Sequence, residues 1–333
     1  MDSGQMIRSA PTVFDAAVQE ELFGRLQTLR KVSLENGRSS DFARFLGEVD
    51  AALKRFEEGT YGECADCHDA VEPERLMADP LMRVCLGCLT DQQRASLEDD
   101  LQLAFDIQQG LLPQAGIKCD KWHVYHAYEP AGIVSGDYVD IIEHGDEFYF
   151  LLGDVSGKGM AASLLMSNLH AAFHSLVPMG LPMTELMKRA NRLLCESSLS
   201  NQYATLICGR ANRSGEVALS NAGHPSPIVV KDGVKAEVDE SALPLGMFCE
   251  AEFPVTRLNL TSGDSIVLFS DGVTETVNSA GAEFGTQGLF EAINGGSANG
   301  PDELVARCLE RVSSFRGAAG RRDDLTMLAV TYL

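Results

Sequence analysis

The N-terminal third of the chain carries two Cys-x-x-Cys pairs, a spacing that few folds accommodate. Cys64 and Cys67 are followed, after 17 residues, by Cys85 and Cys88, which gives the pattern C-x2-C-x17-C-x2-C. Each pair forms a tight turn that directs two thiolates to one point, and two such turns supply the four sulfur ligands that Zn²⁺ prefers. The pattern predicts one structural Zn²⁺ bound by these four cysteines, with the neighbouring His68 as a less favoured alternative ligand.

Helical periodicity surrounds the cysteine pairs. Apolar residues recur at steps of three and four over residues 12–58, with an interruption at "NGRSSD", and this favours an antiparallel helical hairpin over two separately packed helices. A further helix is expected over 91–112, ending near Gly110 and Pro113. Its apolar residues cover more than one face, which indicates contacts on two sides: Leu97, Leu101, Ala104, Phe105, Ile107, Leu111 and Leu112.

The pattern changes at about residue 117 to strands mixed with a few helices. Six apolar runs read as strands: "EFYFLLGDV", "QYATLICGR", "EVALSNA", "PIVV", "SIVLFSDG" and "LTMLAVTYL". Helices are expected over 160–176, 183–197, 285–294 and 302–316. Because several strands follow one another with few helices between them, antiparallel sheets with helices outside are favoured over a doubly wound parallel sheet.

Composition excludes some functions. The chain has 333 residues, 45% of them apolar, and a net charge of −21, which argues against direct binding of nucleic acid because that needs a basic surface. No signal peptide and no apolar run of about 18 residues is present, so a cytoplasmic protein without a membrane span is expected. The five isolated cysteines are expected to be core residues rather than disulfide partners: Cys119, Cys195, Cys208, Cys249 and Cys308.

The turn "GDVSGKG", which follows an apolar strand, raises a choice between a nucleotide loop and a metal-binding aspartate. A nucleotide loop of the Walker type has four residues between its glycines and a hydroxyl residue after the lysine. Here three residues separate Gly153 from Gly157, and Gly159 follows Lys158. The nucleotide interpretation therefore fails on both counts.

Aspartates at several strand ends favour the metal interpretation. A single Asp-Gly pair is ordinarily a turn, but several carboxylates at strand ends, without a matching surplus of Lys or Arg, favour divalent cations. The aspartates concerned are Asp137, Asp140, Asp154, Asp271, Asp323 and Asp324.

Six motifs occur in the order found in metal-dependent (PPM, type-2C) serine/threonine phosphatases: "SGDYVD", "GDVSGKGMAASLLM", "NAGHPSP", "LPLG", "FSDGVTE" and "DDLTMLAV". The resemblance covers about 117–333 and is strongest to the SpoIIE/RsbU branch; "LAFDIQQGLLP" resembles the linker helix that leads into that branch. It implies an α+β fold, an antiparallel β-sandwich flanked by helices (αββα), with two Mn²⁺ or Mg²⁺ ions between the sheets.

The same resemblance implies site residues. Asp154 would bridge both ions, the Val155 carbonyl would complete one site, and Asp271 and Asp323 would bind the second ion. Asp137 would lie at the edge of the cluster, and Asp323 is preferred over Asp324 as the ligand.

Two cations can deprotonate a bridging water and stabilise charge on phosphorus, so no nucleophilic side chain is needed. Lys158 could contact the substrate phosphate or be a solvated surface lysine. For His224, a structural role as a hydrogen-bonding hub at a strand end is favoured over a catalytic role as a general acid.

The stretch "RFEEGTYGECADCHDAVEPERLMADPLMRVCLGC" resembles the zinc finger of DksA/TraR-type proteins. Three parts are therefore predicted: 1–90, a helical hairpin with a C4 zinc finger; 91–116, a linker helix; and 117–333, a phosphatase domain. The expected function is a protein serine/threonine phosphatase that acts on a phosphorylated STAS-domain anti-sigma-factor antagonist in partner-switching signalling. Regulation by the zinc domain and homodimerisation through the linker helix are expected. The alternative is a transcription regulator that binds RNA polymerase through the zinc domain.

Overall fold

The computed structural model describes residues 16–36, 40–197, 202–231, 234–294 and 300–333, and the chain divides into two compact units, Met1–Asp100 and Leu101–Leu333. Within the described residues, no helix is long and apolar enough to cross a bilayer.

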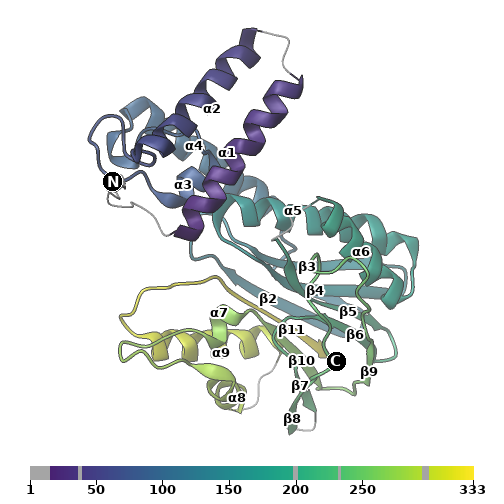
Figure 1. The fold of residues 1–333 in the computed structure, drawn as a ribbon. Coiled ribbons are helices and arrows are strands. Elements are labelled where there is room, and N and C mark those ends of the chain that lie inside the picture. The colour runs from purple at the N-terminus through teal and green to yellow at the C-terminus, as the bar shows by residue number, and fades with distance from the viewer. Residues whose placement is uncertain (1–15, 37–39, 198–201, 232–233, 295–299) are drawn as a thin grey trace, which may run out of the picture. The chain divides into compact units, whose positions relative to one another are not determined.

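The first unit contains a helical hairpin and a small cysteine-containing module. Helices α1 (Ala16–Asn36) and α2 (Ser40–Glu58) pack side by side (Figure 1), and the Nε of Arg30 lies 2.7 Å from a carboxylate oxygen of Asp50. The hairpin prediction is therefore confirmed, although residues 12–15 of the predicted helix lie outside the described residues. Helix α3 (Pro73–Ala78) and a short 3-10 turn (Leu86–Cys88) complete a core shared with α1 and α2. Helix α4 (Asp91–Leu111) continues into the second unit.

The second unit is a sandwich of two antiparallel sheets, as predicted. The six-stranded sheet has the order β1-β2-β11-β10-β7-β8 and the five-stranded sheet the order β3-β4-β5-β6-β9. The strands are β1 (Gly116–Cys119), β2 (Trp122–Glu129), β3 (Asp137–His144), β4 (Glu147–Val155), β5 (Ala204–Asn212), β6 (Glu216–Ala222), β7 (Ile228–Lys231), β8 (Val234–Glu237), β9 (Thr256–Asn259), β10 (Ser265–Phe269) and β11 (Leu325–Tyr332).

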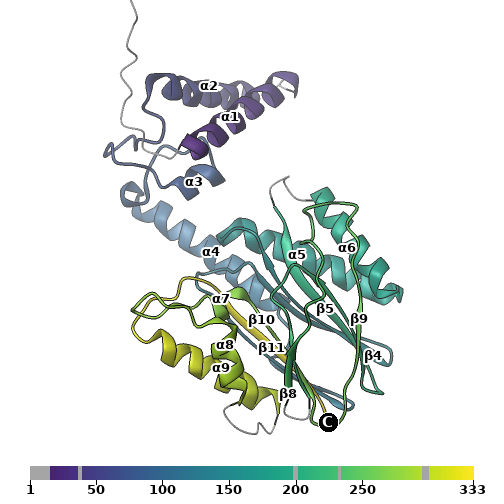
Figure 2. The ribbon, with the colours of Figure 1, turned by 60° about the horizontal axis from the view of Figure 1, so that its bottom comes forward.

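Helices cover both outer faces of the sandwich (Figures 1 and 2). Helices α5 (Gly159–Leu176) and α6 (Met183–Ser197) lie outside the five-stranded sheet, and α7 (Asp271–Thr274), α8 (Gly285–Asn294) and α9 (Pro301–Arg316) belong to the six-stranded side (Figure 2). Because β4 and β11 are covered on both faces, they are almost continuous apolar runs. One core lies between the sheets and one under each helical layer.

One prediction about the isolated cysteines is wrong. Cys208 and Cys308 are buried in the cores as expected, but Cys195 and Cys249 form a disulfide with their Cα atoms 5.9 Å apart, a distance suited to this bond. The pair meets because Asn191 of α6 donates hydrogen bonds to the backbone carbonyls of Phe248 and Cys249. This contact joins segments more than 50 residues apart, which sequence spacing does not reveal.

Candidate active site

Two aspartates of the five-stranded sheet lie directly opposite each other. Asp137 begins β3 and Asp154 lies near the end of β4, and the antiparallel register pairs these two residues. The Val155 carbonyl oxygen and Asp154 Oδ1 approach the same point: they lie 3.1 and 3.2 Å from the position that a Cβ at Gly136 would occupy. The end of this hairpin therefore presents two carboxylates and a backbone carbonyl.

The six-stranded sheet contributes two further aspartates. Asp271 follows β10 and Asp323 precedes β11, and these strands pair antiparallel, so the two residues lie at the same end of the sheet. The sheets are linked here, because the Thr326 hydroxyl on β11 donates a hydrogen bond to Asp137 Oδ2. The four predicted carboxylates thus gather at one end of the sandwich.

The electrostatics show how closely these carboxylates are placed. Burial, followed by the charges of Asp271 and Asp323, raises the pKa of Asp154 from 3.8 to about 7. Burial and the charge of Asp323 also raise the pKa of Asp271, and burial raises that of Asp137 well above its usual range. Such mutual repulsion would be relieved by divalent cations, which take carboxylate oxygens as ligands, so this donor set fits Mn²⁺ or Mg²⁺.

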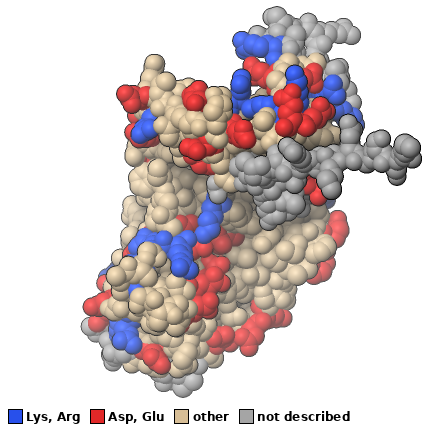
Figure 3. All heavy atoms as spheres, turned by 60° about the vertical axis from the view of Figure 1, so that its left-hand side comes forward, with Lys and Arg blue, Asp and Glu red and all other residues tan. Residues whose placement is uncertain are grey.

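The cluster is open rather than tightly closed. Among the residues that the structure describes, these carboxylates do not form a group of three whose ligand atoms all lie within 4.8 Å of one another. Asp323 instead forms an ion pair with Lys158, with 3.0 Å between Oδ2 and Nζ. The cluster borders a pocket of about 380 Å³ whose wall includes Ile133, Lys158, Met160, Arg321, Arg322 and Asp323. Figure 3 shows basic side chains next to acidic ones on the face drawn there.

Asp323 and Asp324 differ in their contacts. Both carboxylate oxygens of Asp324 accept hydrogen bonds: Oδ1 from the Ala131 backbone N–H at 2.6 Å, and Oδ2 from the Ser135 hydroxyl at 2.6 Å. Asp324 therefore holds the loop that precedes β3. The Asp323 carboxylate accepts hydrogen bonds from the exposed Lys158 ammonium and from the Asp324 backbone N–H. Its side chain is 44% exposed, so the carboxylate is accessible.

The sequence-based prediction that Asp140 joins the other strand-end aspartates at one metal site is wrong. Residues Val139 and Ile141 of β3 face the core between the sheets, whereas Tyr138 and Ile142 face α5 and α6. Because side chains alternate along a strand, Asp140 lies on the helical side, away from Asp137.

Several supporting residues were not anticipated from the sequence. Gln108 of α4 is buried and exchanges two hydrogen bonds with the Ser135 backbone, at 2.8 and 3.0 Å. The Ser135 hydroxyl accepts from the Asp137 N–H, so α4 is connected to the cluster. A polar residue at an otherwise apolar helical position, Gln108, is the one signal that could have indicated this contact.

His224 is a hydrogen-bonding hub, as predicted. Its backbone exchanges two hydrogen bonds with the Asn221 side chain, at 2.8 and 2.9 Å, and its Nδ1 lies 2.9 Å from the Thr205 hydroxyl. Burial lowers the pKa of His224 to about 3, so the imidazole is neutral and is poorly suited to donate a proton.

Gly272 allows the two segments that carry Asp271 and Asp323 to approach each other closely. A Cβ at this position would lie 2.0 Å from the Asp324 carbonyl oxygen. We expect Gly272→Ala to lower the free energy of unfolding by about 1–3 kcal/mol, because the backbone of one segment must move. Urea denaturation measures this. Gly320→Ala, in the loop before β11 with open space at its Cβ, is the control, and equal stabilities of the two variants would contradict the close approach.

The carboxylate cluster also predicts a pH dependence. Without Mn²⁺ or Mg²⁺, the folded protein keeps a proton on Asp154 up to about pH 7, whereas the unfolded chain releases it near the ordinary pKa of 3.8. The folded state binds more protons between these values, so its free energy of unfolding falls as the pH rises from about 4 to about 7. Asp154→Asn should flatten this slope in denaturation curves, and the exposed Asp239→Asn should not; equal slopes would contradict the crowding of Asp154.

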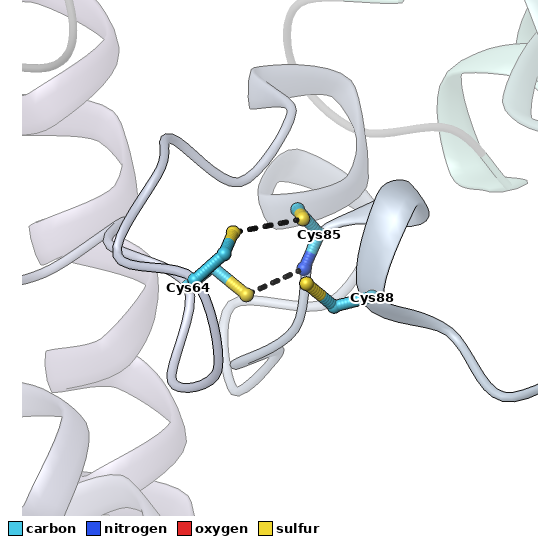
Figure 4. Close-up of side chains that lie close together, drawn as sticks. Cys64, Cys85 and Cys88 are labelled. Atoms are coloured by element: carbon cyan, nitrogen blue, oxygen red, sulfur yellow. Dashed lines mark hydrogen bonds between the residues drawn. The ribbon is translucent and has the colours of Figure 1, made fainter.

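The four cysteines of the first unit converge on one point. Their sulfur atoms all lie within 4.8 Å of one another, and Cys67 and Cys85 are 3.6 Å apart; a tetrahedral Zn²⁺ holds its sulfur ligands about 3.8 Å apart. Figure 4 shows Cys64, Cys85 and Cys88 directed toward each other. Backbone N–H groups of Cys67 and Cys85 lower the pKa of the Cys64 thiol to about 6, which favours the thiolate. The geometry and donor set fit Zn²⁺.

Family models match both units. The model for stage II sporulation protein E (SpoIIE) matches residues 144–333, and the model for the prokaryotic DksA/TraR C4-type zinc finger matches residues 59–94.

Individual relatives agree with these matches. The chain is 26% identical to protein IcfG of Synechocystis, with 69% of this chain and 41% of IcfG covered. It is 28% identical to the phosphoserine phosphatase RsbU of Bacillus subtilis, with 54% of each protein covered. The chain thus spans about half the length of these curated relatives.

A solved structure shares the fold of the second unit. The PP2C domain of SiaA from Pseudomonas aeruginosa superposes with a TM-score of 0.63 at 17% identity, covering 72% of this chain and 98% of that domain. Because the SpoIIE model matches more than half of the chain, the chain belongs to the SpoIIE family of PP2C-type phosphatase domains, and it also carries a DksA/TraR-type zinc finger.

Proposed function

We propose that the chain is a metal-dependent protein serine/threonine phosphatase. The observation that carries this proposal is the gathering of Asp137, Asp154, Asp271 and Asp323 from both sheets at one end of the sandwich, with their pKa values raised or their side chains accessible. Similarity to RsbU, named as a phosphoserine phosphatase, supports the same activity.

We assign each residue of the cluster a role from its position. Asp154 and the Val155 carbonyl would hold one ion, and Asp154, Asp271 and Asp323 would hold the second. Asp137, held by Thr326, lies at the edge, and Asp324 orients the loop before β3. Two Mn²⁺ or Mg²⁺ ions bound here would supply an activated water and stabilise negative charge on phosphorus.

Lys158 is proposed to neutralise the charge of a substrate phosphate. Its ammonium lies 3.0 Å from Asp323 Oδ2 and 3.1 Å from the Arg322 carbonyl oxygen, and it lines the pocket next to the cluster. With the Asp323 carboxylate held as a metal ligand, the Lys158 ammonium would be available to pair with the phosphoryl oxygens of the substrate.

The proposed substrate is a phosphorylated STAS-domain anti-sigma-factor antagonist. We also propose that the zinc domain regulates the phosphatase activity. Phosphate release should be measured with the full chain, a phosphoserine-bearing STAS-domain protein and a small aryl phosphate. We expect release that requires Mn²⁺ or Mg²⁺ and is faster from the protein substrate. Release that persists without added metal and after chelation would contradict the metal requirement. No release from either compound, together with co-purification of RNA polymerase, would instead favour the transcription-regulator alternative suggested by the zinc finger.

Homodimerisation through α4 is part of the proposal. In the single chain Leu103 and Ile107 of this helix are 59% and 57% exposed, which is unusual for large apolar side chains of one helix. We expect Ile107→Glu to shift the mass measured by analytical ultracentrifugation from dimer to monomer. Gln109→Glu, at an exposed polar position of the same helix, should leave the mass unchanged; a monomeric wild type would contradict the dimer.

A further inference from the structure

A second group of potential metal ligands lies on the other face of the five-stranded sheet from the carboxylate cluster. Asp140 of β3 faces α5, where His170 and His174 are four residues apart and therefore project from one face of the helix. The described residues contain two groups of three or more potential metal ligands whose ligand atoms lie within 4.8 Å of one another. One group is the four zinc-finger cysteines, and the other is these three side chains.

The distances suit a bound ion. His174 Nε2 lies 2.9 Å and His170 Nε2 lies 3.9 Å from Asp140 Oδ2, and the two imidazole rings are stacked with centroids 4.1 Å apart. A tetrahedral ion with ligands at about 2.1 Å holds its donor atoms about 3.4 Å apart. The observed separations fall on both sides of that value, so small side-chain movements would accommodate an ion.

The carboxylate is fixed in position by its surroundings. The Tyr138 hydroxyl donates a hydrogen bond to Asp140 Oδ2 and the Ile141 N–H donates one to Oδ1, each at 2.8 Å. Contacts of this kind orient a ligand before the ion binds. The Asp140 side chain is only 3% exposed, whereas that of His174 is 44% exposed, so an ion could enter from the helix side and keep a water as its fourth ligand.

We propose that Asp140, His170 and His174 bind one divalent transition-metal ion, of the kind that prefers imidazole nitrogen, such as Zn²⁺ or Ni²⁺. This site is separate from the zinc finger and from the carboxylate cluster. It joins β3, which begins with Asp137, to α5, which begins directly after Lys158. The bound ion therefore stabilises the two elements that lead into the proposed active site.

The test is a calorimetric titration of Ni²⁺ into the full chain with its zinc finger loaded. Excess Mg²⁺ in the buffer occupies oxygen-ligand sites, because Mg²⁺ prefers carboxylates and water over imidazole. We expect the wild type to bind one Ni²⁺ through this site, and the His170→Gln/His174→Gln double variant to bind it at least tenfold more weakly. His123→Gln, on β2 of the other sheet, should bind Ni²⁺ as the wild type does.

A single variant tests the proposal independently, in case the double variant does not fold. His170→Gln removes one ligand but leaves the 2.9 Å contact between His174 and Asp140, so it should remain folded and still bind Ni²⁺ more weakly. Ni²⁺ should also raise the Tm of the wild type more than that of His170→Gln. Absence of Ni²⁺ binding in the wild type, or equal affinity in the His170 variant, would overturn the proposal and leave the three residues as polar contacts between α5 and β3.

Discussion

Asp271→Asn should lower kcat for phosphate release by at least about 100-fold, the largest effect on activity expected from one substitution. The amide would remove the charge of a proposed metal ligand from a site where the Asp154, Asp271 and Asp323 carboxylates repel one another. Losing about 3 kcal/mol of transition-state stabilisation corresponds to that factor. Initial rates at several Mn²⁺ concentrations separate weaker metal binding from a slower reaction.

The backbone around Asp271 should survive this substitution. Its carbonyl oxygen, not its carboxylate, accepts the hydrogen bonds from Glu275 and Thr274 that form α7. The exposed Asp239→Asn is the matched control for loss of one carboxylate. If Asp271→Asn kept wild-type rates at every Mn²⁺ concentration, Asp271 would not be a metal ligand.

Cys64→Ser should unfold the zinc-binding part of the first unit, the largest structural effect that we expect. Cys64 is buried in the core that Leu22, Leu26 and Leu76 share with the cysteine module. Zn²⁺ binding contributes on the order of 10 kcal/mol to the folding of small domains, and Cys64 is one of the four sulfur ligands that converge here. Metal analysis should show the loss of one Zn²⁺ per chain, and hydrogen exchange should show the loss of protection over residues 59–94.

The second unit should remain folded in that variant, because the described residues of its three apolar cores all lie at or after Leu111. Cys119→Ser, at a half-buried cysteine outside the cluster, controls for replacement of a thiol by a hydroxyl. Retention of zinc and of protection in Cys64→Ser would contradict a structural role for the four-cysteine site.

The parts of the fold that were predictable from the sequence are those with strong local patterns. Strands β4 and β6 and helices α6 and α8 have the bounds expected from their apolar runs and helical spacing. Strands β2 and β3 were not anticipated: β2 mixes His and Tyr with apolar residues, and β3 carries two aspartates. Pairing with neighbouring strands decides their conformation: β2 pairs with β11, about 200 residues further along the chain, and β3 forms a hairpin with the adjacent β4.

The site was predictable to a similar degree. Aspartates at the ends of apolar strands identified the candidates, because sheet geometry gathers strand ends. The side of the sheet on which Asp140 lies could not be predicted without knowing where β3 begins, since a shift of one residue reverses the face. The supporting contacts of Gln108, Ser135 and Thr326 also depend on segments that meet only in the folded chain.

Anomalous diffraction from crystals of the full chain grown with Mn²⁺ would test the metal centre most directly. We expect two Mn²⁺ peaks about 3.5–4 Å apart, with the Asp154 carboxylate between them and Asp271 and Asp323 on one of them. Absence of any peak beside Asp154 at saturating Mn²⁺ would contradict the proposal that these aspartates hold the ions for phosphate ester hydrolysis.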